Sequence, residues 1–182
     1  DIQVGCARTG TFFSFERANI IPDIVVLSKS IGGYGMPFAL TLFKPELDVW
    51  APGEHNGTFR GNQIAIVAAK AGLEFMNEHH IEKEVQRKAV IVKEFLEKNI
   101  KPLNKNFEIR GIGLIWGIET HDEKIAKKIS TECFKNGLIV ERAGRDNSVV
   151  KLMPALTIED DVLEKYQVTP KEFIDVKALM GD

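Results

Sequence analysis

The fold of this chain is decided by one stretch, Ile24-Val25-Val26-Leu27-Ser28-Lys29, which is entered through Pro22-Asp23. A short, apolar, β-branched run of this kind is typical of a strand that is buried on both faces of a parallel sheet. Glycines follow at positions 32, 33 and 35, and residues 39–43 resume an apolar, strand-like pattern. We therefore expect an α/β fold in which a lysine lies at the end of a buried strand, beside a flexible turn.

Helices and strands extend outward from this stretch. Residues 62–77 are rich in alanine and periodic in apolar side chains, and residues 81–96 repeat apolar side chains at helical spacing, so consecutive helices are predicted, the first ending at His79 and His80. Beyond them the sequence predicts strands at 107–110, 114–119, 138–141 and 149–153, a helix at 122–136, and helix starts at 157–160 and 169–170. We expect two domains, 1–100 and a compact α+β unit at 101–182.

Composition narrows the classes of function. The 182 residues include 24 basic and 26 acidic side chains, which gives no reason to expect a nucleic-acid partner. No run approaches the roughly 18 apolar residues that span a bilayer, and no signal pattern is present, so we expect a soluble, cytoplasmic protein. Cys6 and Cys133 are far apart and the four histidines form no ligand pattern, so buried thiols and no metal site are expected.

Lys29 is the candidate for chemistry. A lysine becomes a Schiff-base nucleophile when burial or a neighbouring positive charge lets its amine lose a proton, and the glycines beside it leave room for a planar cofactor. On spacing alone, a lysine that extends from a strand end into solvent is the commoner explanation. A nucleotide-binding domain that uses residues 32–35 is a further alternative, but the GxGxxG spacing and a following helix are absent.

Three ordered motifs change this balance. They are Asp1-Ile2-Gln3-Val4-Gly5-Cys6-Ala7-Arg8-Thr9-Gly10, the stretch from Pro22 to Lys29, and Asn56-Gly57-Thr58-Phe59-Arg60-Gly61-Asn62. Together they resemble the class III (ω-amino) aminotransferases, and the resemblance extends over about residues 1–160 through 110–114 and 154–158. It implies a fragment of a fold type I pyridoxal-phosphate (PLP) transferase. Residues 1–100 would be the end of the large PLP-binding domain, and 101–182 the small C-terminal α+β domain.

The resemblance assigns roles to individual residues. Lys29 matches the lysine that carries PLP as a Schiff base and moves the proton during the exchange. Gln3 matches a glutamine near the phenolic oxygen of the cofactor. Thr58 matches a threonine that binds the cofactor phosphate from the neighbouring subunit, which implies a homodimer.

The amino donor is expected from a narrower resemblance. Residues 28–31, 33–35, 44–50 and 53–63 are similar to class III members that move the terminal amino group of L-2,4-diaminobutyrate to 2-oxoglutarate in ectoine biosynthesis. The products would be aspartate 4-semialdehyde and glutamate. Alternatives are an ω-aminotransferase for 4-aminobutyrate, ornithine or acetylornithine, and a truncated domain without catalytic activity that serves in folding or assembly.

Several positions depart from the family pattern. Ala7 replaces a glycine, and Arg60 stands where most relatives have glycine, which suggests a positive charge for a substrate carboxylate. Lys151 occupies the place of an arginine that grips the α-carboxylate in many relatives, and a lysine offers only a point charge there. The aspartate that pairs with the pyridine nitrogen would stand three positions before Gln3, ahead of Asp1. We therefore expect a piece of a longer protein that is inactive and binds PLP weakly by itself.

Overall fold

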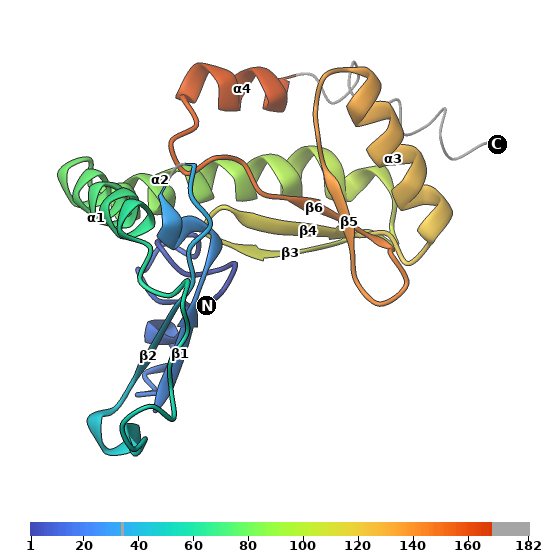
Figure 1. Cartoon of the computed structure of the whole chain (residues 1–182). Coiled ribbons are helices and arrows are strands. Elements are labelled where there is room, and N and C mark those ends of the chain that lie inside the picture. The colour runs from blue at the N-terminus through green and yellow to red at the C-terminus, as the bar shows by residue number, and fades with distance from the viewer. Residues whose placement is uncertain (34, 169–182) are drawn as a thin grey trace. The chain divides into compact units, whose positions relative to one another are not determined.

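The computed structural model describes residues 1–33 and 35–168 of the chain (Figure 1). It divides into two compact units, Asp1–Lys83 and Glu84–Asp182, which we call the N-unit and the C-unit. The division falls within the second helix, α2 (Ile81–Phe95). The boundary near residue 100 stays a prediction about the domains of a complete enzyme.

The N-unit contains a two-stranded antiparallel sheet. Strand β1 (Ile24–Leu27) pairs with β2 (Leu40–Phe43), with Leu27 opposite Leu40. Both strands lie where the sequence predicts them, but the expectation of a parallel sheet with both faces buried is wrong for the described residues, because Ile24 is 56% exposed and Val26 40%. The described residues of the connection, 28–33 and 35–39, form a 3₁₀ turn and no crossover helix, so the chain returns antiparallel.

A small apolar cluster holds the N-unit together. Its buried members are Cys6, Leu27 and Ile31, and the partly buried side chains packed against it are Phe12, Phe13, Val25, Phe38, Leu40 and Met76. The cluster joins the beginning of the chain to both strands and to the first long helix.

That helix is α1 (Gln63–Glu78), which confirms the prediction for residues 62–77. Asn62 caps it, because its side-chain oxygen accepts hydrogen bonds from the backbone N–H groups of Ile64 (3.0 Å) and Ala65 (3.2 Å). The helix ends at Glu78 with His79 as its C-cap, and the sequence had predicted that His79 and His80 end it. It packs closely on the glycine turn after β1: a Cβ atom on Gly33, whose φ is +63°, would lie 2.6 Å from the carbonyl oxygen of Ala68.

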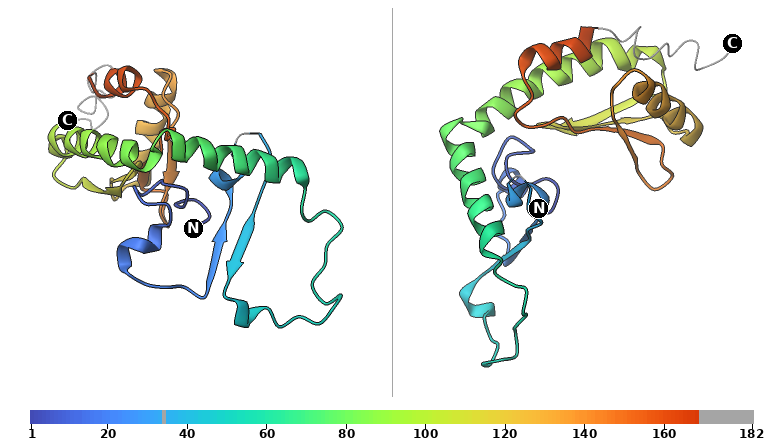
Figure 2. Two further views of the ribbon diagram at one scale, coloured as in Figure 1. Left: turned by 90° about the vertical axis from the view of Figure 1, so that its left-hand side faces the viewer. Right: turned by 45° about the horizontal axis from the view of Figure 1, so that its top comes forward.

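The C-unit is built on a four-stranded antiparallel sheet in the order β3-β4-β6-β5 (the strands are labelled in Figure 1, and Figure 2 gives two further views of the ribbon). The strands are β3 (Glu108–Ile112), β4 (Ile115–Glu119), β5 (Glu141–Ala143) and β6 (Val149–Leu152). Helices α2, α3 (Glu123–Lys135) and α4 (Asp160–Val168) each contribute side chains to a cavity that the sheet also lines. A π-helical turn, Leu96–Ile100, continues α2. The helix start predicted at 169–170 lies outside the described residues.

One strand is displaced from its prediction. Residues 138–141 were expected to form a strand, whereas β5 begins at Glu141. The reason is that the backbone N–H of Leu138 donates to the carbonyl of Cys133 at 2.8 Å, which keeps this residue in the closing turn of α3. The strand therefore begins only after the backbone carbonyl of Cys133, near the end of α3, has received its hydrogen bond.

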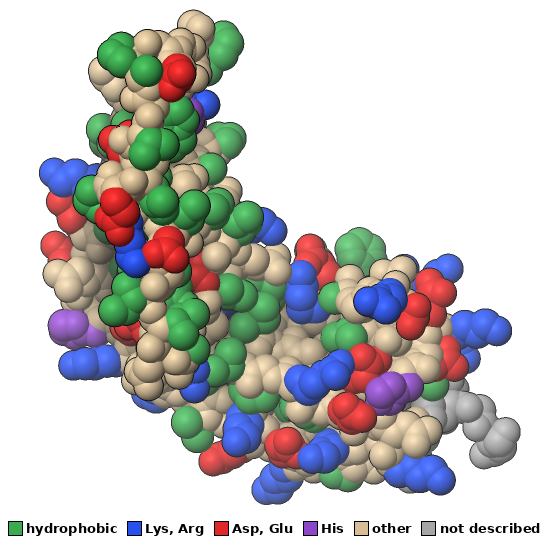
Figure 3. All heavy atoms as spheres, turned by 90° about the horizontal axis from the view of Figure 1, so that it is seen from below, with side chains coloured by type: hydrophobic (Ala, Val, Ile, Leu, Met, Phe, Trp, Pro, Cys, Tyr) green, Lys and Arg blue, Asp and Glu red, His purple; other side chains and the backbone are tan. Residues whose placement is uncertain are grey.

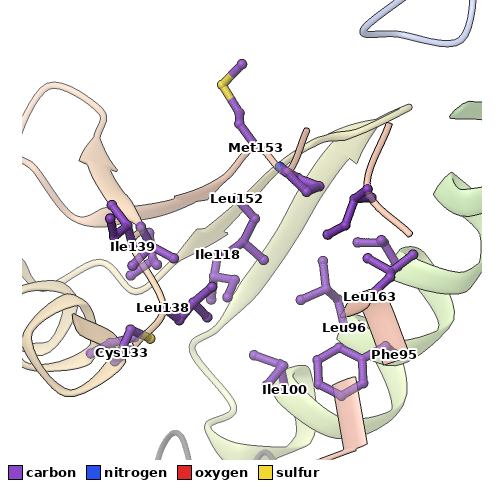
Figure 4. Close-up of a pocket in the computed structure, with 16 residues that line it drawn as sticks. Phe95, Leu96, Ile100, Ile118, Cys133, Leu138, Ile139, Leu152, Met153 and Leu163 are labelled. Carbon is purple, nitrogen blue, oxygen red and sulfur yellow. The ribbon is translucent and has the colours of Figure 1, made fainter. Parts of the chain in front are cut away.

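The core of the C-unit is larger than that of the N-unit. Its fully buried side chains include Leu96, Leu114, Ile129 and Val150. Leu96, Ile129 and Val150 also line the apolar cavity, which has a volume of about 170 Å³. In it Ile118 and Leu152 from the sheet face residues of the helices (Figure 4). Cys133 lines this cavity, and burial raises the pKa of its thiol to about 11. Both cysteines are buried and free, as predicted.

Candidate active site

Lys29 lies two residues after the end of β1, where Ser28 separates the strand from a 3₁₀ turn that begins at Lys29 (Lys29–Gly32). Its backbone lies in the left-handed region with φ 53°, which is unusual for a residue with a long side chain. The neighbours Leu27 and Ile31 are buried in the apolar cluster and hold the backbone there. The side chain is exposed, and no hydrogen bond or ion pair of its ammonium group is found within residues 1–33 and 35–168.

Gln3 lies in a segment that packs against β1. It is half-buried, and two residues later a Cβ atom on Gly5 would lie 3.0 Å from Cδ2 of Leu27 and 2.9 Å from the carbonyl oxygen of Asp1. The Asp1 carboxylate in turn accepts hydrogen bonds from the backbone N–H and the hydroxyl of Ser14. The structure thus brings the backbone of the first motif against the strand that carries Lys29.

Arg8 is a buried charge in the same motif. Only 8% of it is exposed, and burial lowers the pKa of its guanidinium. Sequence reasoning treated this residue as part of a motif and gave no sign that the arginine would be buried.

Thr58 and Arg60 lie in the turn region that precedes α1. All residues from 51 to 64 are exposed, including Thr58. Arg60 Nη1 donates to His55 Nε2 at 2.7 Å, and the His55 ring stacks on Trp50 with the ring centroids 4.6 Å apart. The sequence predicted Arg60 as a candidate residue but missed His55, because two residues five positions apart in a loop give no periodic signal.

Lys151 belongs to the C-unit. It lies on β6 opposite Glu141 of β5, and its Nζ is 2.5 Å from Glu141 Oε2. The side chain is 18% exposed, so the ammonium is held against the sheet. A substrate carboxylate would have to compete with Glu141 for this charge.

The glycine turn after Lys29 meets the helix that follows Thr58 and Arg60. Gly72 of α1 also approaches it closely, since a Cβ atom there would lie 3.2 Å from Cα of Gly33. All three motifs are therefore connected within one unit, through the packing of segment 1–10 on β1 and of α1 on the turn.

The family of aminotransferases described as "Aminotransferase class-III" matches residues 1–169. The chain belongs to this family. Among the curated relatives, the diaminobutyrate–2-oxoglutarate transaminase of Halalkalibacterium halodurans is 49% identical over 99% of this chain and 42% of the relative. The enzyme of the same name from Streptomyces coelicolor is 52% identical over 93% of this chain and 41% of the relative. The chain therefore spans about two fifths of the length of these relatives.

Solved structures agree with the family. The ornithine aminotransferase of Toxoplasma gondii, in which PLP partially occupies the active site, superposes with a TM-score of 0.89 at 25% identity over 98% of this chain and 43% of its own. The acetylornithine aminotransferase of Elizabethkingia anophelis gives 0.81 at 27% identity over 92% of this chain and 42% of its own. The fold is thus part of a fold type I PLP transferase, as the sequence predicted, and the family implies PLP as the cofactor.

The residues of the N-unit fit this cofactor. A fixed strand end presents a lysine that has no partner among the described residues, and an amide and a hydroxyl side chain are available at Gln3 and Thr58. An amine can bond to an aldehyde, and hydroxyl and backbone N–H groups suit a phosphate. The assignments of Lys29, Gln3, Thr58, Arg60 and Lys151 remain predictions.

Two other observations concern only residues 1–33 and 35–168. No helix there is both long enough and apolar enough to cross a membrane. No group of three or more histidine, cysteine or acidic side chains there is arranged to hold a metal ion.

Proposed function

We propose that this chain is part of an enzyme that transfers the terminal amino group of L-2,4-diaminobutyrate to 2-oxoglutarate, giving aspartate 4-semialdehyde and glutamate. The observation that carries the proposal is the identity of 49% and 52%, over almost the whole chain, to relatives with that named activity. The match includes the fixed strand end at Lys29 and the loop with Arg60.

In this proposal Lys29 holds the cofactor and then acts as the base. PLP, when bound, supplies an electron sink next to the substrate carbon that bears the amino group. Lys29 Nζ removes the proton from that carbon, which requires the amine to be neutral and shielded from water. Because the Lys29 side chain is exposed in this chain, we expect the shielding to come from the remainder of a complete enzyme and from a second subunit.

A homodimer would explain the surface of the N-unit. Large apolar side chains are exposed there, with Ile21 at 85%, Val49 at 80% and Phe59 at 96%. Figure 3 shows many hydrophobic side chains among the polar ones on one face of the molecule. Apolar surface of this kind is covered in stable assemblies. Phe59 adjoins Thr58, so a dimer contact here is consistent with a threonine that serves the phosphate of the other subunit.

The carboxylates of the substrates need positive charge. Arg60 is exposed and is hydrogen-bonded only to the His55 ring among the described residues, with no carboxylate partner there, so its charge is available to an anion. Lys151 is the weaker candidate, because Glu141 neutralises it. We propose Arg60 as the main carboxylate contact and give Lys151 only an accessory role.

The activity is tested with the complete enzyme in a coupled assay for glutamate. We expect L-2,4-diaminobutyrate to be preferred over 4-aminobutyrate, ornithine and acetylornithine. Ornithine and acetylornithine are the competitors that the solved structures suggest, since aminotransferases named for them share the fold at 25% and 27% identity. A preference for ornithine would replace the proposed donor and leave the transaminase assignment standing.

A separate experiment tests whether the protein uses PLP at all. Borohydride reduction of the complete enzyme, followed by peptide mapping, is expected to place the pyridoxyl label on Lys29. A protein that serves only in folding or assembly would carry no label. The 182-residue chain alone is expected to give no stoichiometric absorbance band of bound cofactor.

A further inference from the structure

His55 stands at the centre of a line of contacts that ends at Arg60. Phe43, the last residue of β2, meets Trp50 edge to face with ring centroids 5.4 Å apart. Trp50 stacks on His55 at 4.6 Å and an interplanar angle of 24°. His55 Nε2 lies 2.7 Å from Arg60 Nη1. An exposed arginine is thus connected, ring by ring, to the strand pair of the N-unit.

The hydrogen bond fixes the state of the imidazole. A guanidinium group can only donate, so Nε2 of His55 must accept and its proton must be on Nδ1. The ring is therefore neutral. Arg60 keeps its whole charge, because no carboxylate pairs with it among the described residues: the nearby Glu54 carboxylate instead accepts from the backbone N–H of Ala51 at 2.7 Å.

The stem of Arg60 is also guided by the backbone. A Cβ atom on Gly57 would lie 2.9 Å from Nε and 3.1 Å from Cγ and Cδ of Arg60, so the side chain folds over a glycine. The backbone N–H of Arg60 donates to the carbonyl of Gly57 at 3.0 Å, which closes the turn underneath. A long side chain in an exposed loop would otherwise lose several rotamers on binding an anion.

We propose that His55 is the positioning residue for Arg60: it holds one guanidinium nitrogen as a neutral acceptor, is itself held by Trp50, and leaves the other donors for a substrate carboxylate. The inference rests on the proposed transaminase function, because it gives Arg60 an anionic substrate. His55 holds the Arg60 guanidinium in place before the substrate arrives. It therefore affects substrate binding and not the proton transfer at Lys29.

Steady-state kinetics of the complete enzyme tests this division. His55→Ala is expected to raise the apparent KM for 2-oxoglutarate about three- to tenfold, as for the loss of one hydrogen bond to a charged group, with kcat within about twofold. His55→Gln offers a carbonyl acceptor and is expected to restore the KM to within about twofold of the parent enzyme. His79→Ala is the matched control, since His79 also stacks on an aromatic ring, that of Phe75 at 4.0 Å, and is expected to change neither constant.

A double-mutant cycle links the two residues. In an Arg60→Ala background, His55→Ala is expected to have no further effect on the KM, because the residue acts through the arginine. Additive effects would overturn the inference, and so would an unchanged KM in His55→Ala or in Arg60→Ala. An enzyme that transfers no amino group from any donor would instead refute the proposed function.

A spectroscopic measurement reads the contact without any reaction. NMR of the ring nitrogens, with isotope-labelled histidine in the full protein, is expected to show His55 neutral with the proton on Nδ1. Arg60→Ala is expected to shift the Nε2 resonance while leaving His79 unchanged. A proton on Nε2 in the parent protein would exclude the hydrogen bond and with it the positioning role.

Discussion

The two units differ in how much of their apolar surface they bury themselves. The C-unit contains a four-stranded sheet, and its buried side chains include Leu96, Ile129 and Val150. The N-unit has one strand pair and a small cluster around Leu27, while Val49 and Phe59 are almost fully exposed. Yet the N-unit contains four of the five predicted site residues. The comparison teaches that the unit with the smaller buried core carries most of the predicted site residues, so the predicted chemistry lies where the packing within the unit is less extensive.

The largest expected effect tests the chemical side of this comparison. Lys29→Ala in the complete enzyme is expected to lower kcat by roughly 10²–10⁴-fold, because the base for proton transfer is removed. Lys44→Ala is the control: this lysine, which directly follows β2, forms an ion pair with Asp23 and has no predicted role. Single-turnover kinetics with L-2,4-diaminobutyrate measures both variants. Equal losses would show that the N-unit responds to any change in its charge.

Core truncation tests the packing side. Leu96→Ala is expected to destabilise the C-unit by about 2–5 kcal/mol, since Leu96 is 1% exposed and borders the cavity. Leu73→Ala, in α1 of the N-unit, deletes the same atoms from a side chain that is 38% exposed, and is expected to cost under about 1 kcal/mol. Denaturant titration of the chain, followed through buried Trp116 in a Trp50→Phe background, gives the first value, and circular dichroism gives the second. Similar costs would erase the difference between the units.

A pair of glycines tests how the turn after Lys29 is held. Gly33→Ala is expected to lose about 1–3 kcal/mol, because the new methyl group would lie 2.6 Å from the Ala68 carbonyl oxygen. Gly35 also has a positive φ, but among the described residues other than its chain neighbours no atom lies within 4 Å of its Cβ position, so Gly35→Ala is expected to cost about 1 kcal/mol from backbone strain alone. Thermal unfolding of the two variants gives the ranking, and the reverse ranking would show that α1 does not fix the turn.

The smallest expected effect concerns acid stability of the C-unit. The Ser148 hydroxyl, which donates to Glu119 Oε1 at 2.6 Å, lowers the pKa of this carboxyl, and the backbone N–H of His121 and the charge of Arg110 act in the same direction. The unfolded chain therefore binds a proton more readily than the folded one. The stabilisation is present above the ordinary glutamate pKa of about 4.3 and is lost as the pH falls through the lower folded value. Glu119→Gln should flatten the dependence of the unfolding midpoint on pH below this range, and an unchanged slope would contradict it.

The sequence predicted those parts of the fold that depend on local periodicity. Helix α1 was expected to begin at residue 62, where Asn62 is the cap, and its termination by His79, which is the C-cap, was also predicted. The strand before Lys29 was found from its β-branched run. The predicted parallel pairing of this strand was wrong, because an apolar run shows that a segment favours a strand and does not show which strand it pairs with.

The candidate site was predictable only in part. Lys29, Gln3, Thr58, Arg60 and Lys151 came from resemblance to a family, since spacing alone favoured a solvent-exposed lysine. Individual side-chain contacts could not be predicted from the sequence. The hydrogen bond between His55 and Arg60 depends on how a loop turns, and the ion pair of Lys151 with Glu141 depends on how β5 and β6 pair. Such contacts decide which charges are available, and no periodic pattern encodes them.

The two buried thiols can serve as probes of local opening, one in each unit. Cys6 belongs to the N-unit and Cys133 to the C-unit, and burial raises the pKa of both. A thiol that stays protonated and covered reacts with an alkylating reagent only during a local opening. The modification rate of each cysteine, followed by mass spectrometry, would therefore report the opening frequency of its own unit, without any engineered label.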